Sequence, residues 1–216
     1  MTDPNRTLIA ALLDRSGSME TSKQATEDGW RELINEQRQL PGECQVTLAQ
    51  FDTVYEVVYS PTPIAEVPDF VVEPRGRTAL LDAVGKFVTE IGEQLSALAE
   101  DQRPGHVICL IMTDGMENAS HDWDWDAARK LTRQQQDQWN WKFIFIGANI
   151  DAIEVGARIG LAYGDSITYD DSDHDATVGV MRSARLMVRK SREGEDAAFS
   201  DEARRAAMGR PKESTK

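Results

Sequence analysis

The sequence predicts an α/β domain, built on a doubly wound and mostly parallel sheet with helices on both faces and one antiparallel edge strand. Three observations lead to this prediction. Short apolar runs alternate with longer segments of helical periodicity along most of the chain. Residues 8–13 are apolar at every position, as expected for a strand that is buried on both faces. The strand-like runs at 44–51 and 54–59 are so close in sequence that they must pair as an antiparallel hairpin, which places one strand at an edge.

Turn-forming residues separate the elements of the first half of the chain. Pro41-Gly42 ends the first helical pattern, and three prolines then mark an irregular crossing before the loop at 74–78. Either Arg77 or Thr78 could open the helix that follows this loop. The elements expected in this half are a strand at 8–13, a helix at 19–40, strands at 44–51 and 54–59, and a helix at 79–98.

The second half repeats the alternation and then becomes polar. Ser120 and Asp122 are candidate N-caps for the helix that runs to about residue 138. Residues 5–192 form the predicted domain, and 193–216 are a polar C-terminal tail in which 200–208 could form one short helix, the rest being mobile. The remaining elements expected in this half are strands at 106–112, 141–146 and 165–169, and helices at 151–159 and 176–192.

The composition is strongly acidic, with 24 Lys and Arg against 37 Asp and Glu and a net charge of −13. Nucleic acids and anionic membranes bind clustered positive charge, so neither is an expected partner.

No segment resembles a signal peptide or is long enough to span a membrane, so we expect a cytoplasmic protein.

Cys44 and Cys109 fall on strands that should flank the first strand on opposite sides. They are therefore too far apart for a disulfide and are expected to be buried free thiols.

Oxygen-bearing side chains gather on three loops at one end of the predicted sheet. Asp14, Ser16 and Ser18 follow the first strand at alternate positions, Thr78 precedes a helix, and Asp114 follows the strand at 106–112. In open α/β sheets, ligands bind at the carboxyl ends of the strands. Carboxylates and hydroxyls are hard ligands that suit Mg²⁺, Mn²⁺ or Ca²⁺. Taken singly, the three residues after the first strand could be helix caps, but the combined set indicates a divalent cation.

The order Asp14-Arg15-Ser16-Gly17-Ser18, then Thr78, then Asp114 resembles the metal-ion-dependent adhesion site (MIDAS) of the von Willebrand factor A (VWA) family. In that family an Asp-x-Ser-x-Ser motif is combined with a distant Thr and a distant Asp. The resemblance covers roughly residues 7–190, and the chain looks most similar to compact bacterial and phage-encoded members. It implies a Rossmann-like VWA fold.

The resemblance also implies the role of each residue. Ser16 and Ser18 would bind the metal directly, and Thr78 directly or through water. Asp14 and Asp114 would lie around the ion, often bridged to it by water. In such domains an Asp or Glu of a partner protein commonly completes the coordination of the metal, which we expect to be Mg²⁺, or else Mn²⁺ or Ca²⁺.

Three further residues are candidate partner contacts. Arg77 stands where many family members have Gly, and a cation there would either repel the metal or pair with an acidic partner; we favour the pairing. Glu117 fits a loop role better than a ligand role, but it lies close enough to be a contact. Trp123 belongs to the segment 121–126, which is either an exposed recognition surface or an acidic first helical turn with both tryptophans packed inward.

These residues predict a non-enzymatic, divalent-metal-dependent module for protein–protein interaction. The sequence contains neither a nucleophile elbow with a partnered base nor a Gly-rich phosphate loop. Two alternatives stay open. One is a Mg²⁺-dependent phosphoester hydrolase, suggested by an open cation site among acids. The other is an assembly subunit whose metal site is only structural.

Overall fold

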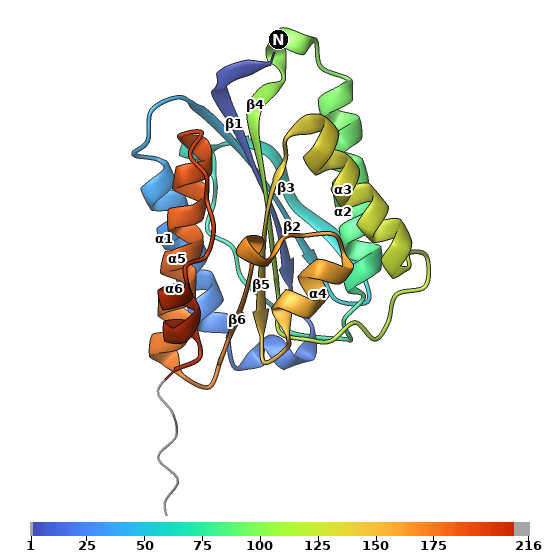
Figure 1. The fold of residues 1–216 in the computed structure, drawn as a ribbon, viewed down its shortest axis with the longest axis vertical. Coiled ribbons are helices and arrows are strands. Elements are labelled where there is room, and N and C mark those ends of the chain that lie inside the picture. Colours follow the sequence, from blue (N-terminus) through green and yellow to red (C-terminus); the bar gives the residue numbers. More distant parts are fainter. Residues whose placement is uncertain (1, 210–216) are drawn as a thin grey trace, which may run out of the picture.

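The computed structural model describes residues 2–209, which form one six-stranded sheet with helices on both faces (Figure 1). The strand order is β3-β2-β1-β4-β5-β6. Only β3 pairs antiparallel with its neighbour, and it lies at an edge, so the predicted α/β class with one antiparallel edge strand is confirmed. The strands are β1 (Asp3–Asp14), β2 (Glu43–Phe51), β3 (Tyr55–Pro63), β4 (Pro104–Thr113), β5 (Lys142–Ala148) and β6 (Ser166–Tyr169).

The helices form two layers, one on each face of the sheet (Figure 1). Alternate residues of β1 face opposite layers: Ile9 packs with the first layer and Leu12 with the second. This double burial explains why residues 8–13 are apolar throughout. The first layer contains α1 (Lys23–Gln37), α5 (His174–Arg192) and α6 (Asp201–Ala207), and the second contains α2 (Leu80–Ser96), α3 (Trp125–Trp139) and α4 (Ala152–Arg158).

The first helix begins later than the sequence predicts. A short 3-10 turn, Gly17–Glu20, follows the motif loop, because the Met19 N–H donates to the Ser16 carbonyl at 3.0 Å. The α-helix then starts at Lys23 rather than at Met19.

Two helix starts are capped by residues other than those predicted. Neither Arg77 nor Thr78 caps α2; instead the Leu81 N–H donates to the carboxylate of Glu117 at 2.9 Å. Helix α3 is capped by Asp124, which accepts from the Ala127 N–H at 2.8 Å. Ser120 and Asp122, the predicted caps, belong to the loop before this helix.

The segment after α5 packs against the sheet. Its backbone reaches β6 and the turn before it, since the Phe199 N–H donates to Gly164 at 2.8 Å and the Asp170 N–H donates to Ala207 at 3.0 Å. Phe199 and Ala207 are buried in the first layer. Helix α6 falls inside the predicted range 200–208, but the expectation of a mobile tail does not hold up to residue 209, because these apolar side chains anchor it. Residues 210–216 lie outside the described part of the chain.

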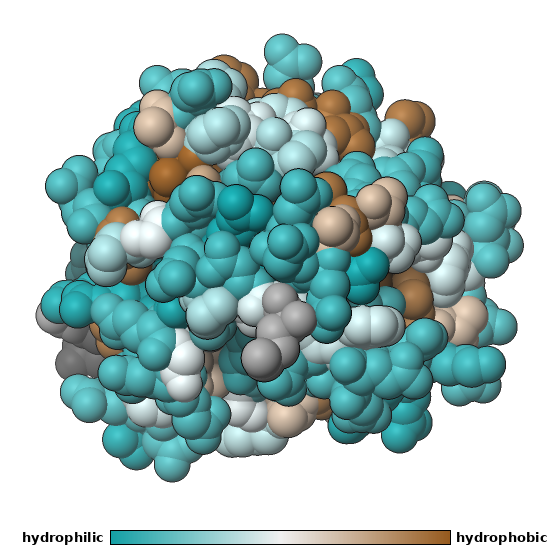
Figure 2. All heavy atoms as spheres, turned by 90° about the horizontal axis from the view of Figure 1, so that it is seen from above, coloured by the Kyte–Doolittle hydropathy of each residue, from teal (hydrophilic) through white to brown (hydrophobic). Residues whose placement is uncertain are grey.

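The surface at the amino end of the sheet is mostly hydrophilic, with hydrophobic side chains in separate small patches (Figure 2). Across residues 2–209, no helix has the length and apolar content required to cross a bilayer. Cys44 on β2 and Cys109 on β4 are buried free thiols on the two sides of β1, as predicted.

Candidate metal centre

The carboxyl ends of β1 and β4 bring three of the predicted ligands together. These two strands are parallel neighbours, so the loops that follow them lie side by side. Ser18 Oγ donates to Asp114 Oδ1 at 2.6 Å, and Ser16 Oγ lies 3.1 Å from Ser18 Oγ. Residues 96 positions apart in sequence therefore share one cluster of oxygen atoms.

Asp14 lies at the base of this cluster and is fully buried. Its Oδ1 accepts from the Ser16 N–H at 2.6 Å, and its Oδ2 accepts from Thr113 Oγ1 at 2.5 Å. The carboxylate therefore fixes the start of the motif loop and the end of β4 relative to each other. Thr113 lies just beyond the predicted strand 106–112 and was not among the predicted site residues; its place directly before Asp114 was the available signal.

Thr78 reaches the cluster from the loop before α2. Its side chain is buried against Gly115, where any side chain would collide with Thr78 Oγ1. Asn118 holds this position from both sides: its N–H donates to the Thr78 carbonyl at 3.0 Å, and its Oδ1 accepts the Thr78 N–H at 3.2 Å. The Gly17 N–H also donates to the Gly76 carbonyl at 3.4 Å, so the first two loops touch.

The two carboxyl groups of the cluster are destabilised as anions. Burial raises the pKa of Asp14 to about 6, although hydrogen bonds from Thr113 and Ser16 lower it in part. Burial also raises the pKa of Asp114. Asp114 Oδ2 is buried and has no hydrogen-bond partner in the described chain. A cation at this oxygen would supply both the missing partner and the missing positive charge, so the residues fit a metal.

The chemistry of the cluster favours a hard cation. Two carboxylates are combined with three hydroxyl side chains, and all of the available donor atoms are oxygen. Within residues 2–209, no group of three or more His, Cys, Asp or Glu side chains is placed to hold a metal. A metal at this cluster would therefore need the Ser and Thr hydroxyls in addition to the two carboxylates.

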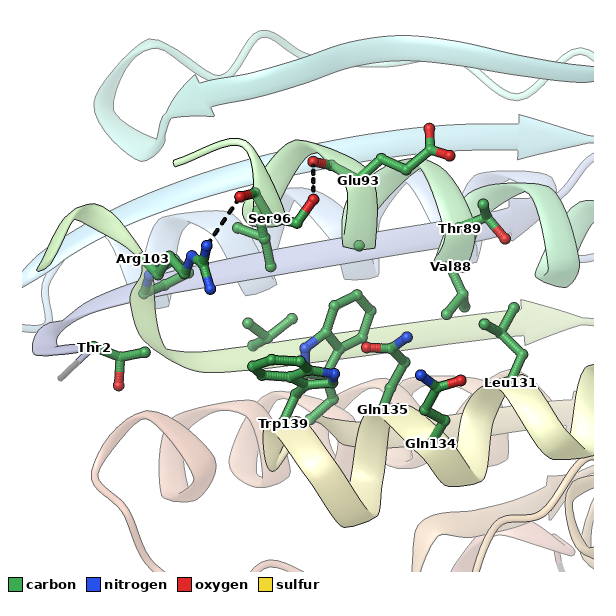
Figure 3. A pocket seen from close by; sticks show the side chains of 15 residues that line it. Thr2, Val88, Thr89, Glu93, Ser96, Arg103, Leu131, Gln134, Gln135 and Trp139 are labelled. Atoms are coloured by element: carbon green, nitrogen blue, oxygen red, sulfur yellow. Dashed lines mark hydrogen bonds between the residues drawn. The ribbon is translucent and has the colours of Figure 1, made fainter. Parts of the chain in front are cut away.

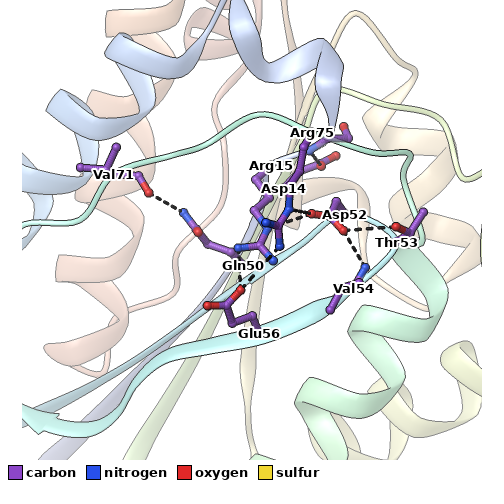
Figure 4. A network of polar contacts seen from close by, with 10 residues as sticks. Asp14, Arg15, Gln50, Asp52, Thr53, Val54, Glu56, Val71 and Arg75 are labelled. Carbon is purple, nitrogen blue, oxygen red and sulfur yellow. Dashed lines mark hydrogen bonds and ion pairs between the residues drawn. The ribbon is translucent and has the colours of Figure 1, made fainter.

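A buried ionic network supports the motif loop from behind (Figure 4). Arg15 Nε donates to Asp52 Oδ2 at 3.0 Å, and Arg75 Nε donates to the same oxygen at 2.9 Å. Arg15 Nη1 also lies 2.8 Å from Glu56 on β3. Burial alone would raise the pKa of Asp52, but hydrogen bonds from Arg75, the Val54 N–H and Arg15 bring that pKa below its usual value. The sequence does not reveal this network, because the two arginines lie 37 and 23 residues from Asp52 along the chain.

The three predicted partner contacts lie in different settings. Arg77 is exposed, and its Nη2 donates to the Asn118 carbonyl at 2.6 Å. The Glu117 carboxylate is occupied by backbone N–H groups, including those of Leu81 and Ser120, so its role is structural. These contacts agree with the loop role favoured for Glu117, and its use as a partner contact stays a prediction.

Trp123 likewise has a packing role. Its indole lies directly against Gly85 of α2 and joins the second core layer. Trp125 packs in the same layer, with the Arg158 guanidinium 3.5 Å above its ring. Of the two readings of segment 121–126, the structure has the inward-packed one. Asp82, which the sequence reasoning did not single out, holds the segment by accepting the backbone N–H groups of residues 121–123 at 2.8–2.9 Å.

Comparison with known proteins identifies the fold. No family model matches the chain, and no curated protein matches it significantly. Proximal thread matrix protein 1 (PTMP1) from the mussel byssus matches with a TM-score of 0.62 and 17% identity, over 85% of this chain and 48% of that one. A von Willebrand factor type A structure from Catenulispora acidiphila matches with a TM-score of 0.57 and 15% identity, over 84% and 42%.

A second PTMP1 structure, described as having a zinc-occupied MIDAS motif, matches with a TM-score of 0.59 and 14% identity, over 85% of this chain and 46% of that one. The chain thus spans less than half the length of these proteins. It has the fold of von Willebrand factor A domains, and the predicted resemblance is confirmed at the level of the fold.

Proposed function

We propose that this protein is a non-enzymatic module that binds a divalent metal and, through the metal, an acidic side chain of a partner protein. One observation carries the proposal: Asp114 Oδ2 is buried without a partner beside the hydroxyls of Ser16 and Ser18. A buried carboxylate oxygen without a hydrogen bond is costly unless a cation neutralises it. The similar fold of a mussel protein with a metal in its MIDAS motif supports the same reading.

The metal would be held by the oxygen atoms of the cluster. Ser16, Ser18 and Thr78 would supply hydroxyls, and Asp14 and Asp114 would supply carboxylates directly or through water. We favour Mg²⁺, with Mn²⁺ or Ca²⁺ as alternatives, because the donors are hard oxygens and few of them are charged. The MIDAS motif of the mussel protein holds zinc, so zinc is a further candidate, although zinc more often takes nitrogen and sulfur ligands, which this cluster lacks.

The charge of the protein explains why a metal would be needed for an acidic partner. A chain with a net charge of −13 repels acidic partners at long range. Two carboxylates only neutralise a divalent ion, so its open position still attracts a third carboxylate. Arg77, exposed beside Asn118, adds one positive charge at the same rim. The metal, with Arg77 beside it, would then attract an acidic side chain at this rim.

The position of one histidine, His106, agrees with the proposed non-enzymatic role. His106 pairs with Thr7 at the amino end of the sheet, at the opposite end from the cluster. A hydrolase would need a proton-transferring group within hydrogen-bond reach of the metal-bound water.

We place the protein in the cytoplasm, where a reducing environment keeps buried thiols such as Cys44 and Cys109 free.

Calorimetric titration with Mg²⁺ and Mn²⁺ tests the metal site. The wild-type protein should bind one ion, Asp114→Ala should lose this binding, and Asp137→Ala, which removes an exposed acid on α3, should retain it. Equal metal affinity in all three proteins would disprove the proposed site.

A second experiment tests whether partners bind through the metal. Partners are captured on immobilised wild-type protein, with and without a chelator, and on immobilised Ser16→Ala. Partners that bind equally well under every condition do not use the metal.

A further inference from the structure

A cavity of about 310 Å³ lies at the opposite end of the sheet from the oxygen cluster. It opens between α2 and α3, over the first residues of β4, and nothing in the proposed metal-dependent function uses it (Figure 3). Pockets for small molecules usually measure about 300–1,000 Å³. This cavity is therefore large enough for a molecule of one or two rings.

The walls of the cavity are mainly apolar and aromatic. Val88 and Leu131 line it from the two helices, and Val107 from the sheet. Two indoles add flat surfaces: Trp141 is buried and stacked on Phe143 at 6.2 Å, whereas Trp139 is 57% exposed. Flat aromatic walls favour a flat aromatic guest, because paired aromatic rings contribute binding free energy in addition to that of the apolar area they bury.

One polar side chain faces this apolar space without a partner. Gln135 is only 8% exposed, and no hydrogen bond joins its side-chain amide to residues 2–209, although the amide is not among the side-chain groups that are both fully buried and unpartnered. Its neighbours on α3 are bonded: Gln134 donates to Gln138 at 3.4 Å, and Gln136 donates to the Thr132 carbonyl at 3.2 Å. Figure 3 shows the Gln135 amide directed into the gap between the two helices.

The opposite wall leaves space for a methyl-sized group beside this amide. Gly92 on α2 faces Gln135, and a methyl group on Gly92 would lie 3.8 Å from Gln135 Nε2, at ordinary contact distance. The position tolerates a side chain, so a glycine is not required by the packing. With glycine present, the space beside the amide stays open.

We propose that this cavity binds a small planar aromatic molecule that carries an amide-like edge. The side-chain amide of Gln135 offers a donor and an acceptor on adjacent atoms, so it pairs best with a group that offers an acceptor and a donor in return, such as an aromatic amide or lactam. The ring of the guest lies among the two indoles and the apolar walls. The rim carries one acid, Glu93, and one base, Arg103, so the site selects a neutral molecule.

Benzamide is the probe for this proposal, with binding followed by ligand-observed NMR and by quenching of tryptophan fluorescence. We expect saturable binding of benzamide, and weaker binding of both benzene, which lacks the amide, and cyclohexanecarboxamide, which lacks the flat ring. Gln135→Leu should weaken the binding of benzamide by about fivefold, as expected for the loss of one hydrogen bond. Gly92→Leu should abolish benzamide binding, because the leucine side chain fills the space. Gln138→Leu, on the same helix but outside the cavity, should change nothing.

The proposal fails if benzamide does not bind up to its solubility limit, or if it binds Gln135→Leu and Gln138→Leu equally. In either case water is the natural partner of the Gln135 amide. Circular dichroism shows whether the Gly92 variant is folded; if it is not, the glutamine pair decides the question. Benzamide binding should persist with a chelator and in Asp114→Ala, so this test does not depend on the metal site.

Discussion

Arg15 and Asp52 form a buried ion pair, with Arg15 Nε 3.0 Å from Asp52 Oδ2 and both side chains less than a tenth exposed. Arg15 lies inside the Asp-x-Ser-x-Ser motif, and Asp52 lies at the start of the β2–β3 hairpin. The pair joins the loop that presents two hydroxyls to the proposed metal with an edge of the sheet. Its geometry therefore affects both the stability of the fold and the position of Ser16.

Removing Asp52 should be strongly destabilising. In Asp52→Ala, Arg15 would lose its buried partner and keep only the exposed carboxylate of Glu56, and breaking a buried pair costs about 3–5 kcal/mol. The matched control is Asp69→Ala. The Asp69 side chain is 79% exposed and pairs with Arg31 at the surface, so its removal should cost about 0–1 kcal/mol. Urea unfolding of both variants measures the difference. Similar losses would mean that the buried pair contributes no more than a surface pair.

The contribution of Asp52 should depend on pH. Its pKa is lowered in the folded protein, so the anion stabilises the fold at any pH above its unfolded pKa of about 3.9. As the pH falls below that value and through the folded pKa, the carboxyl becomes protonated and the stabilisation is lost. The difference in free energy of unfolding between wild type and Asp52→Asn should be constant from pH 8 to about 5 and shrink below about 4. A difference that grows in acid would contradict this assignment.

Divalent metal should stabilise the folded protein. A ligand that binds only the folded state, present at about 100 times its Kd, adds about 2.7 kcal/mol to the free energy of unfolding. Thermal unfolding with Mg²⁺ and then with excess EDTA should show a fall in Tm for the wild type and none for Ser16→Ala. Ser183→Ala, a hydroxyl deletion on α5 far from the cluster, is the control and should respond as wild type does. A Tm that does not change with metal in the wild type would contradict the proposed site.

Both cysteines should be unreactive in the folded protein. Burial raises the pKa of Cys44 to about 11 and raises that of Cys109 further, so almost no thiolate is present at pH 8. Iodoacetamide should label neither residue in native buffer and both in urea, which intact-mass spectrometry would count. Rapid labelling of Cys44 in the native state would mean that the first residues of β2 open readily.

The ligands of the proposed site could be predicted from sequence because their signals are local. Asp14 ends an apolar run, and Asp114 ends another, so their place at the carboxyl ends of parallel strands follows from periodicity alone. Thr78 required the family pattern, since its loop has no strand before it.

The supporting contacts could not be predicted, because each joins a side chain to a distant partner. Glu117 accepts from the N–H of Leu81 at the start of α2, 36 residues earlier in the sequence, and Asp82 holds a loop about 40 residues away. Neither contact produces a pattern within one window of sequence, so an acid that caps a distant helix cannot be told from an acid that meets a partner. The packing of the C-terminal segment was missed for the same reason: Phe199 is a single apolar residue in a polar stretch.

Substitution of Arg77 distinguishes two effects of its charge, repulsion of the metal and attraction of an acidic partner, which the sequence does not rank. Its guanidinium is exposed and bonded to the Asn118 carbonyl, next to the loop that holds Thr78. If it mainly repels the metal, Arg77→Gln should tighten Mg²⁺ binding and leave the partner interaction equal or stronger. If it mainly attracts an acidic partner, Arg77→Gln should weaken partner binding while metal affinity changes little.

We expect the second outcome, because an exposed charge is screened by water and salt and acts weakly on the metal, whereas a partner's carboxylate approaches it directly. Calorimetry with Mg²⁺ and partner binding at two salt concentrations distinguish the effects. The partner interaction of wild type should weaken with salt more steeply than that of Arg77→Gln. Arg182→Gln, an exposed arginine on α5, should match wild type in both measurements. Tighter metal binding in Arg77→Gln with an unchanged partner interaction would assign Arg77 to the metal instead.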